Sequence, residues 1–156
     1  MGILAEHLGE WHGTNAFRLT PDATPHEAPA VVRVSAAVRG LVTEVAYTWS
    51  HAEAGEQTGL LVMAAAEEAP GVMAMWSDTF HQSPSAAWLS GTSEGGTLKF
   101  VYSYAGDWQW HIVIDTSDPA RLGIRMDNVV PASAAAQGYP PGTYWAMKAD
   151  LAQSRE

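Results

Sequence analysis

Hydrophobic and polar residues alternate along much of this chain with a period of two. Near the N-terminus, Trp11, Asn15 and Phe17 belong to a mostly apolar set that alternates with a mostly polar one. The alternation returns in residues 41–49 and 108–115. Because successive side chains of an extended strand point to opposite faces, this pattern predicts strands with one buried face.

Applied to the whole chain, the pattern predicts nine or ten short strands separated by turns rich in Gly, Pro and Asp. A short helical turn is expected over residues 2–8, and residues 131–141 form the longest irregular stretch, a predicted mobile rim. Residues 59–65 would also suit a helix, but their length and flanking glycines favour a strand. The strands are expected at residues 10–19, 30–38, 41–49, 59–65, 72–80, 86–91, 98–104, 108–115, 122–130 and 144–151.

These elements describe an all-β protein whose strands follow one another as an antiparallel meander. A sheet of so many strands leaves exposed edges unless it closes on itself or stacks. We therefore predict a single domain over residues 1–156, an up-and-down β-barrel of nine or ten strands, with a sandwich as the alternative. A barrel of about this size is either filled by side chains or holds one small ligand.

Composition supports a globular domain and argues against several classes of partner. Hydrophobic residues make up 47% of the chain and charged residues 16%. With a net charge of −9 and no Lys/Arg cluster, neither nucleic acid nor an anionic membrane surface is expected as a partner. The chain has no Cys, which excludes disulfides, thiol nucleophiles and Cys-ligated metals.

Targeting and membrane signals are also missing from the sequence. The N-terminal residues lack a basic segment followed by an apolar run of signal length, and no run of about 18 apolar residues occurs. We therefore predict a soluble, cytoplasmic protein.

A short motif at the start of the first predicted strand carries a family resemblance. Residues 8–14 read L-G-E-W-H-G-T and resemble the G-x-W-x-G opening of lipocalin-like and nitrobindin-like barrels. In those barrels a tryptophan of the first strand seals one end, so the resemblance implies this position for Trp11. With GLVTEVAYTW, MWSDTF, RLGIRMDNV and a final Tyr-Trp strand, the chain looks like a bacterial family of calycin-like domains of unknown function.

The resemblance also bears on cofactors, because the nitrobindin branch binds haem through a histidine near its C-terminal end. None of the six histidines of this chain lies beyond position 111, so haem binding is only a third hypothesis and no cofactor is predicted. The histidines also lack the spacing of a metal site, and no metal is expected. They are His7, His12, His26, His51, His81 and His111.

Residues 72–91 hold the densest mixture of aromatic and ionisable side chains. Trp76 and Asp78 share a face if this segment is a strand, and an inward face would bury the carboxylate beside an indole. Asp78 and His81 are therefore the candidate acid–base groups, and Asp78 could equally anchor a ligand by a hydrogen bond. The alternative is an exposed pair on a turn beside a buried Trp.

Seven Trp and five Tyr suggest an aromatic pocket inside the barrel, although ordinary core packing is the alternative. Arg125 and Asp127 share a face that we expect to be outside and ion-paired across strands. The candidate ligand-binding residues are Asn15, Tyr47, Trp49, Trp76, Trp88, Tyr102, Trp110, Asn128 and Trp145.

The leading hypothesis is a barrel that binds a small hydrophobic or aromatic molecule in its interior. The alternative is a cofactor-independent enzyme, such as a cyclase, isomerase or hydrolase of a natural-product-like small molecule, with Asp78 and His81 as acid–base groups. No G-x-S-x-G elbow and no phosphate-binding glycine loop is present. A purely structural role and a homodimer stay open.

Overall fold

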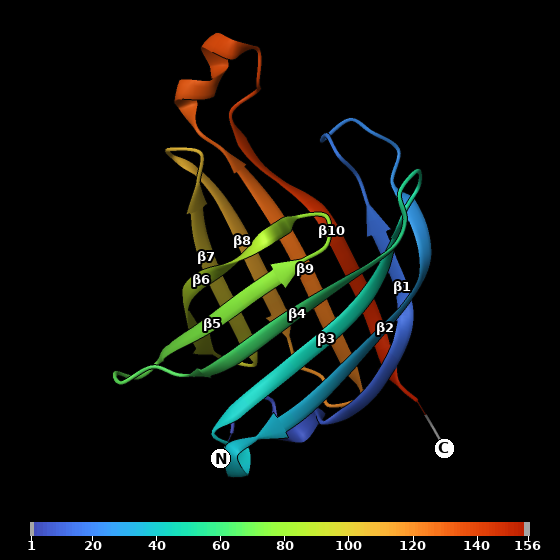
Figure 1. Cartoon of the computed structure of the whole chain (residues 1–156), viewed down its shortest axis with the longest axis vertical. Helices are drawn as coiled ribbons and strands as arrows, with labels where there is room; N and C mark the ends of the chain where they lie inside the picture. The colour runs from blue at the N-terminus through green and yellow to red at the C-terminus, as the bar shows by residue number, and fades with distance from the viewer. Residues whose placement is uncertain (1, 155–156) are drawn as a thin grey trace.

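Ten antiparallel strands close into a barrel within residues 2–154, the part of the chain that the computed structural model describes (Figure 1). Each strand pairs with its neighbours in sequence, and β1 pairs with β10 to complete the ring. The predicted up-and-down barrel is therefore confirmed. The strands are β1 Gly9–Phe17, β2 His26–Ala37, β3 Val42–His51, β4 Gly55–Ala65, β5 Gly71–Asp78, β6 Gln82–Glu94, β7 Thr97–Tyr104, β8 Trp108–Asp115, β9 Arg121–Val130 and β10 Gly142–Gln153.

Three short 3-10 helices accompany the strands, namely η1 Ala5–His7, η2 Val38–Gly40 and η3 Ala132–Gln137. The helical turn predicted before Gly9 is present as η1, and η3 lies in the stretch predicted to be irregular. Strands β2 and β6 are longer than predicted, because pairing with their neighbours continues through polar residues that show no alternation. Leu19 was assigned to the first strand but lies beyond it and is exposed.

The two ends of the barrel differ in structure. Because strands alternate in direction, the loops after β1, β3, β5, β7 and β9 gather at one end, where η3 projects (Figure 1). We call this the η3 end. Helices η1 and η2 lie at the opposite end, which we call the η1 end (Figure 1).

The interior is divided in the same way. Toward the η1 end it is packed with aliphatic side chains, Met and Phe100, almost all of which exclude solvent completely. They include Leu61, Met63, Phe100, Ile112, Ile114, Leu122, Met126 and Leu151. Toward the η3 end, Trp, Tyr, Asn and Asp replace most of them, whereas the buried polar side chains of the η1 end are His7 and Thr43.

The G-x-W-x-G segment closes the η1 end. The fully buried Trp11 stacks on His7 at 5.4 Å between ring centroids, and its Nε1 donates a hydrogen bond to the His7 carbonyl oxygen at 2.8 Å. Gly9 has a φ of +121°, a conformation that glycine alone adopts readily. At Gly13, a Cβ would overlap the carbonyl oxygen of Asp150 on β10. The structure thus gives a physical reason for the residue type at Gly9, Trp11 and Gly13, the three specified positions of the motif.

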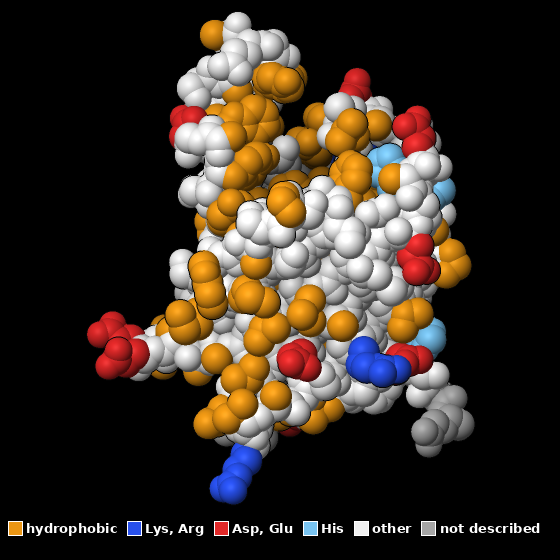
Figure 2. All heavy atoms as spheres, in the orientation of Figure 1, with side chains coloured by type: hydrophobic (Ala, Val, Ile, Leu, Met, Phe, Trp, Pro, Cys, Tyr) orange, Lys and Arg blue, Asp and Glu red, His pale blue; other side chains and the backbone are white. Residues whose placement is uncertain are grey.

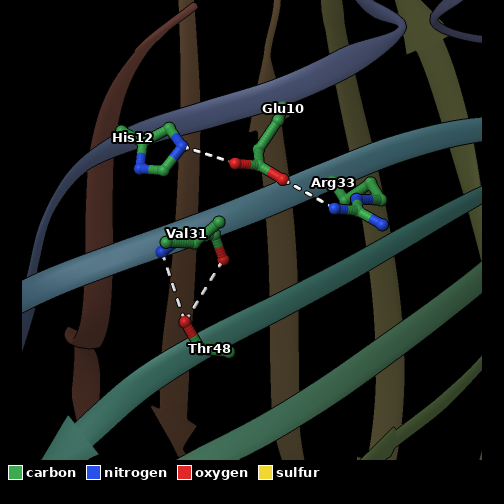
Figure 3. A network of polar contacts seen from close by, with 5 residues as sticks. All are labelled: Glu10, His12, Val31, Arg33 and Thr48. Carbon is green, nitrogen blue, oxygen red and sulfur yellow. Dashed lines mark hydrogen bonds and ion pairs between the residues drawn. The ribbon is translucent and has the colours of Figure 1, made fainter. Parts of the chain in front are cut away.

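The outer wall carries a surface polar network that joins β1, β2 and β3 (Figure 3). Glu10 accepts hydrogen bonds from His12 and Arg33, each at 2.7 Å, and the Arg33 hydrogen bond is the main cause of its lowered pKa. The Thr48 hydroxyl accepts a hydrogen bond from the backbone N–H of Val31 and donates one to the Val31 carbonyl oxygen. Exposed pairs of this kind contribute little to stability.

Gly13→Ala should lower the free energy of unfolding by about 1–3 kcal/mol, because the added methyl group forces β1 away from the β10 backbone. The neighbouring Thr14 is exposed, so the control Thr14→Ala should change stability by about 0.5 kcal/mol or less. Urea unfolding followed by far-UV circular dichroism measures both. Equal and small losses would contradict the close approach of the two strands.

Candidate functional site

Asp78 is the centre of the polar cluster at the η3 end. It is 1% exposed, and its two oxygens accept four hydrogen bonds. Oδ2 accepts from Tyr47 Oη at 2.7 Å and from Trp49 Nε1 at 3.1 Å. Oδ1 accepts from the backbone N–H groups of Phe80 at 2.9 Å and His81 at 2.8 Å.

The local sequence explains why these groups meet. Tyr47 and Trp49 are two residues apart on β3 and share its inward face, as Trp76 and Asp78 do on β5. Gly59 on β4 lies between them, paired with both Tyr47 and Asp78. A Cβ at Gly59 would overlap the Tyr47 ring, so the glycine leaves the space through which the phenol reaches the carboxylate.

Tyr47 links the carboxylate to a second indole. Its hydroxyl donates to Asp78 and accepts a hydrogen bond from Trp76 Nε1 at 2.9 Å. Burial, followed by the negative charge of Asp78, raises the pKa of Tyr47 well above its ordinary value. The phenol therefore remains a protonated donor, and the acceptor positions of the Asp78 carboxylate are nearly all occupied.

His81 lies among aromatic rings. Its imidazole stacks on Trp49 at 4.9 Å and 14° and contacts Trp110 at 4.9 Å and 39°. No hydrogen bond joins the side chains of His81 and Asp78, and His81 Nε2 has no partner among the described residues. Burial lowers the His81 pKa to about 4, assisted by His51 and opposed by the charge of Asp78. The imidazole is therefore neutral at pH 7.

A cavity of about 140 Å³ adjoins this cluster. Five of its six lining residues carry rings, and two of these, Trp76 and Trp110, lie nearly parallel at 6.1 Å. Trp110 Nε1 is buried and, like His81 Nε2, has no partner within residues 2–154. Figure 2 shows a hollow at the η3 end with hydrophobic side chains on both sides. The lining residues are Trp76, His81, Gln82, Tyr102, Tyr104 and Trp110.

Asn128 supports the cavity wall. Its Oδ1 accepts a hydrogen bond from Tyr104 Oη at 2.5 Å, and its Nδ2 donates to Tyr144 Oη at 3.1 Å. Tyr144 in turn donates to the Leu19 carbonyl oxygen at 2.9 Å. Burial, and next the nearby Tyr144, raises the Tyr104 pKa. The predicted pocket donor Asn128 thus holds Tyr104 in place, whereas Asn15 is buried with an unpartnered Nδ2 and does not line the cavity.

Two predicted pocket residues lie outside the barrel, and their assignment to the interior was wrong. Trp88 is 75% exposed and pairs with Met75 on the outer wall, because the neighbouring Ala87 and Leu89 take the inward positions. Trp145 lies between Arg18 at 3.9 Å and Lys148 at 4.2 Å on the outer face. A β-bulge beside Trp145 breaks the alternation that the sequence suggested.

The sequence analysis missed two residues of the site and one contact on the outer wall. Tyr104 and Gln82 line the cavity, and Tyr104 ends the same aromatic stripe as Tyr102, which was the available signal. Arg125 and Asp127 lie outside as expected, but they pair along one strand, with Arg125 Nε at 2.9 Å from Asp127 Oδ1, and not across strands.

Comparison with protein families and with curated proteins assigns no role to the site. No protein-family model and no curated protein matches the chain. Among residues 2–154, no three His, Asp or Glu side chains lie together as metal ligands. The same residues contain no helix of the length and apolarity that crossing a membrane requires.

Tyr47→Phe should lower the free energy of unfolding by roughly 1–3 kcal/mol, since Asp78 loses one donor and Trp76 Nε1 loses its acceptor in a buried site. Tyr102→Phe is the matched control, because its hydroxyl forms no hydrogen bond with the described residues, and little change is expected. Urea unfolding compares the two variants. A loss no larger than that of the control would rule out the anchoring role.

His81 should make stability depend on pH. Its pKa is about 4 in the folded protein against 6.5 ordinarily, so unfolding takes up protons between these values. The contribution of His81 is therefore complete above the ordinary pKa and is lost as the pH falls toward 4. From this residue we expect the free energy of unfolding to be about 2 kcal/mol smaller at pH 5 than at pH 7.

Urea unfolding of the unaltered chain and of His81→Gln at both pH values isolates this contribution, because the variant lacks the titrating group but keeps the backbone donor to Asp78. The same pH-dependent loss in both proteins would show that His81 is not its source.

Proposed function

We propose that this barrel binds a small, neutral aromatic molecule in the cavity at the η3 end. The observation that carries the proposal is an aromatic-walled cavity in which two lining residues, Trp110 and His81, each have a buried ring nitrogen without a partner among the described residues. A buried donor without a partner costs about 1–3 kcal/mol. A ligand atom that accepts a hydrogen bond would recover part of this cost.

The volume of the cavity and the charge of its lining residues restrict the kind of ligand that fits. An apolar cavity of roughly 150 Å³ is large enough for benzene, so about 140 Å³ favours a single ring with a short substituent. None of the lining residues is charged at pH 7, since His81 is neutral there. A neutral ring with a carbonyl or ether oxygen meets these conditions, and the volume disfavours the third hypothesis, a haem.

The hydrogen bonds of Asp78 bear on the enzyme hypothesis. Four donors occupy this carboxylate, which supports an anchoring role, whereas His81 lines the cavity together with Tyr102 and Tyr104. Acid–base catalysis by Asp78 and His81 stays a prediction of the alternative function, as do the absence of nucleic acid and membrane partners and the homodimer.

We also propose that the chain is a calycin-like barrel of bacterial type and that it is cytoplasmic. The first proposal is supported by the ten-stranded closed barrel and by the role of the G-x-W-x-G segment at the η1 end. The cytoplasmic location stays a prediction.

A matched pair of ligands tests the binding function. Acetophenone carries a carbonyl oxygen, and α-methylstyrene has nearly the same shape without an acceptor. We expect acetophenone to quench Trp fluorescence and to bind roughly 3- to 10-fold more tightly, as one additional hydrogen bond allows. Isothermal titration gives both affinities.

Trp110→Phe should remove most of this preference, because the variant keeps a ring but loses the Nε1 donor. Trp88→Phe is the control on the outer wall and should leave both affinities unchanged. If neither ligand alters the fluorescence or the melting temperature of the unaltered protein, the proposed function is wrong.

A further inference from the structure

A row of aromatic rings continues from the cavity to the outside of the η3 end. Tyr102 and Tyr104 line the cavity and stack at 6.3 Å and 16°. Tyr104 contacts Trp108 at 6.1 Å, and Trp108 contacts Tyr139 edge to face at 5.4 Å. We call Tyr104, Trp108 and Tyr139 the aromatic shelf.

The shelf is held in position by the segment around η3. Ser133 Oγ donates to the carboxylate of Asp107 in the β7–β8 turn, at 2.9 and 3.1 Å to its two oxygens. The backbone N–H of Tyr139 donates to the Ala134 carbonyl oxygen at 3.2 Å, after Gly138 in the left-handed conformation. The first contact connects the η3 segment to the β7–β8 turn and the second holds the backbone within the segment, so the Tyr139 ring is presented beside Trp108.

Exposed apolar side chains gather around the same end. Tyr139 is 52% exposed, Leu19 in the β1–β2 loop is 64% exposed and Phe80 in the β5–β6 loop is 39% exposed. Figure 2 shows hydrophobic side chains on both sides of the hollow between these loops and the η3 lobe. Large apolar side chains exposed together around a concavity mark a binding surface more often than a surface without function.

The cavity has room for one ring only. A longer ligand must therefore extend out of the cavity, and its outer part would lie on the shelf. Tyr104 belongs to both the cavity lining and the shelf. A molecule with one ring in the cavity can therefore contact aromatic side chains along its whole length as it extends outward. Neither the shelf nor the cavity lining carries a charge at pH 7, which favours a neutral extension.

Resting on the proposed function, we infer that the natural ligand is an elongated neutral molecule with two aromatic rings in line. The inner ring occupies the cavity beside Trp110 and His81, and the outer ring lies on Trp108 and Tyr139. Tyr139 is then a specificity-determining residue that selects ligand length without contributing to the inner ring's binding.

The test compares acetophenone with 4-acetylbiphenyl, which has the same acetyl group and a second ring in line. We expect the unaltered protein to bind 4-acetylbiphenyl at least about tenfold more tightly. Tyr139→Ala should weaken 4-acetylbiphenyl binding about fivefold, as the loss of one aromatic contact allows, and change acetophenone binding less than twofold. Isothermal titration measures all affinities, with circular dichroism as a check of folding.

Trp88→Ala, which removes an exposed ring from the outer wall, is the control and should alter neither affinity. Trp108→Leu is a second variant and should reduce the preference for the longer ligand in the same direction. If acetophenone binds but the second ring adds nothing, or if Tyr139→Ala weakens both ligands equally, the extended site is wrong and the cavity stands. If neither ligand binds, the proposed function fails and the inference fails with it.

Discussion

The arrangement of side chains inside the barrel at its η3 end depends on the burial of one carboxylate. A buried carboxylate without hydrogen bonds would be prohibitively unfavourable, and Asp78 has no cation partner among the described residues. Four neutral donors replace the lost water, two from inward side chains of β3 and two from the backbone after β5. Each donor must keep its position, and this requirement sets the orientation of Tyr47 and Trp49 and the course of the β5–β6 turn.

The β5–β6 turn also positions residues of the candidate site. Because the backbone N–H of His81 is bound to Asp78, its imidazole is directed between Trp49 and Trp110. Tyr47 holds Trp76 through the same cluster, and Trp76 forms part of the cavity wall. A residue that the sequence marks as a catalytic candidate therefore acts in this structure as the anchor around which the wall is assembled.

Packing at the two ends of the barrel explains why the cavity lies at the η3 end. Buried aliphatic side chains, Met and Phe fill the half toward η1, and Trp11 with His7 covers its end. Large flat rings occupy the other half, and a cavity remains between them. The exposed rings and apolar side chains around the η3 loops continue this apolar interior to the surface.

The strands and their meander order follow from the sequence, because a period of two with turn residues between the runs needs only local information. That Trp76 and Asp78 share a face follows for the same reason, but only the structure decided that this face points into the barrel and that Asp78 does not lie on an exposed turn. Tertiary structure alone decided the sides on which Trp88 and Trp145 lie, because a bulge or the register of a neighbouring strand can reverse a face while the local pattern stays unchanged. It also decided that Asp78 meets Tyr47 and Trp49 across Gly59, and that Asn128 binds Tyr104, since these contacts join residues 24 to 31 positions apart on strands that pair with a common strand between them.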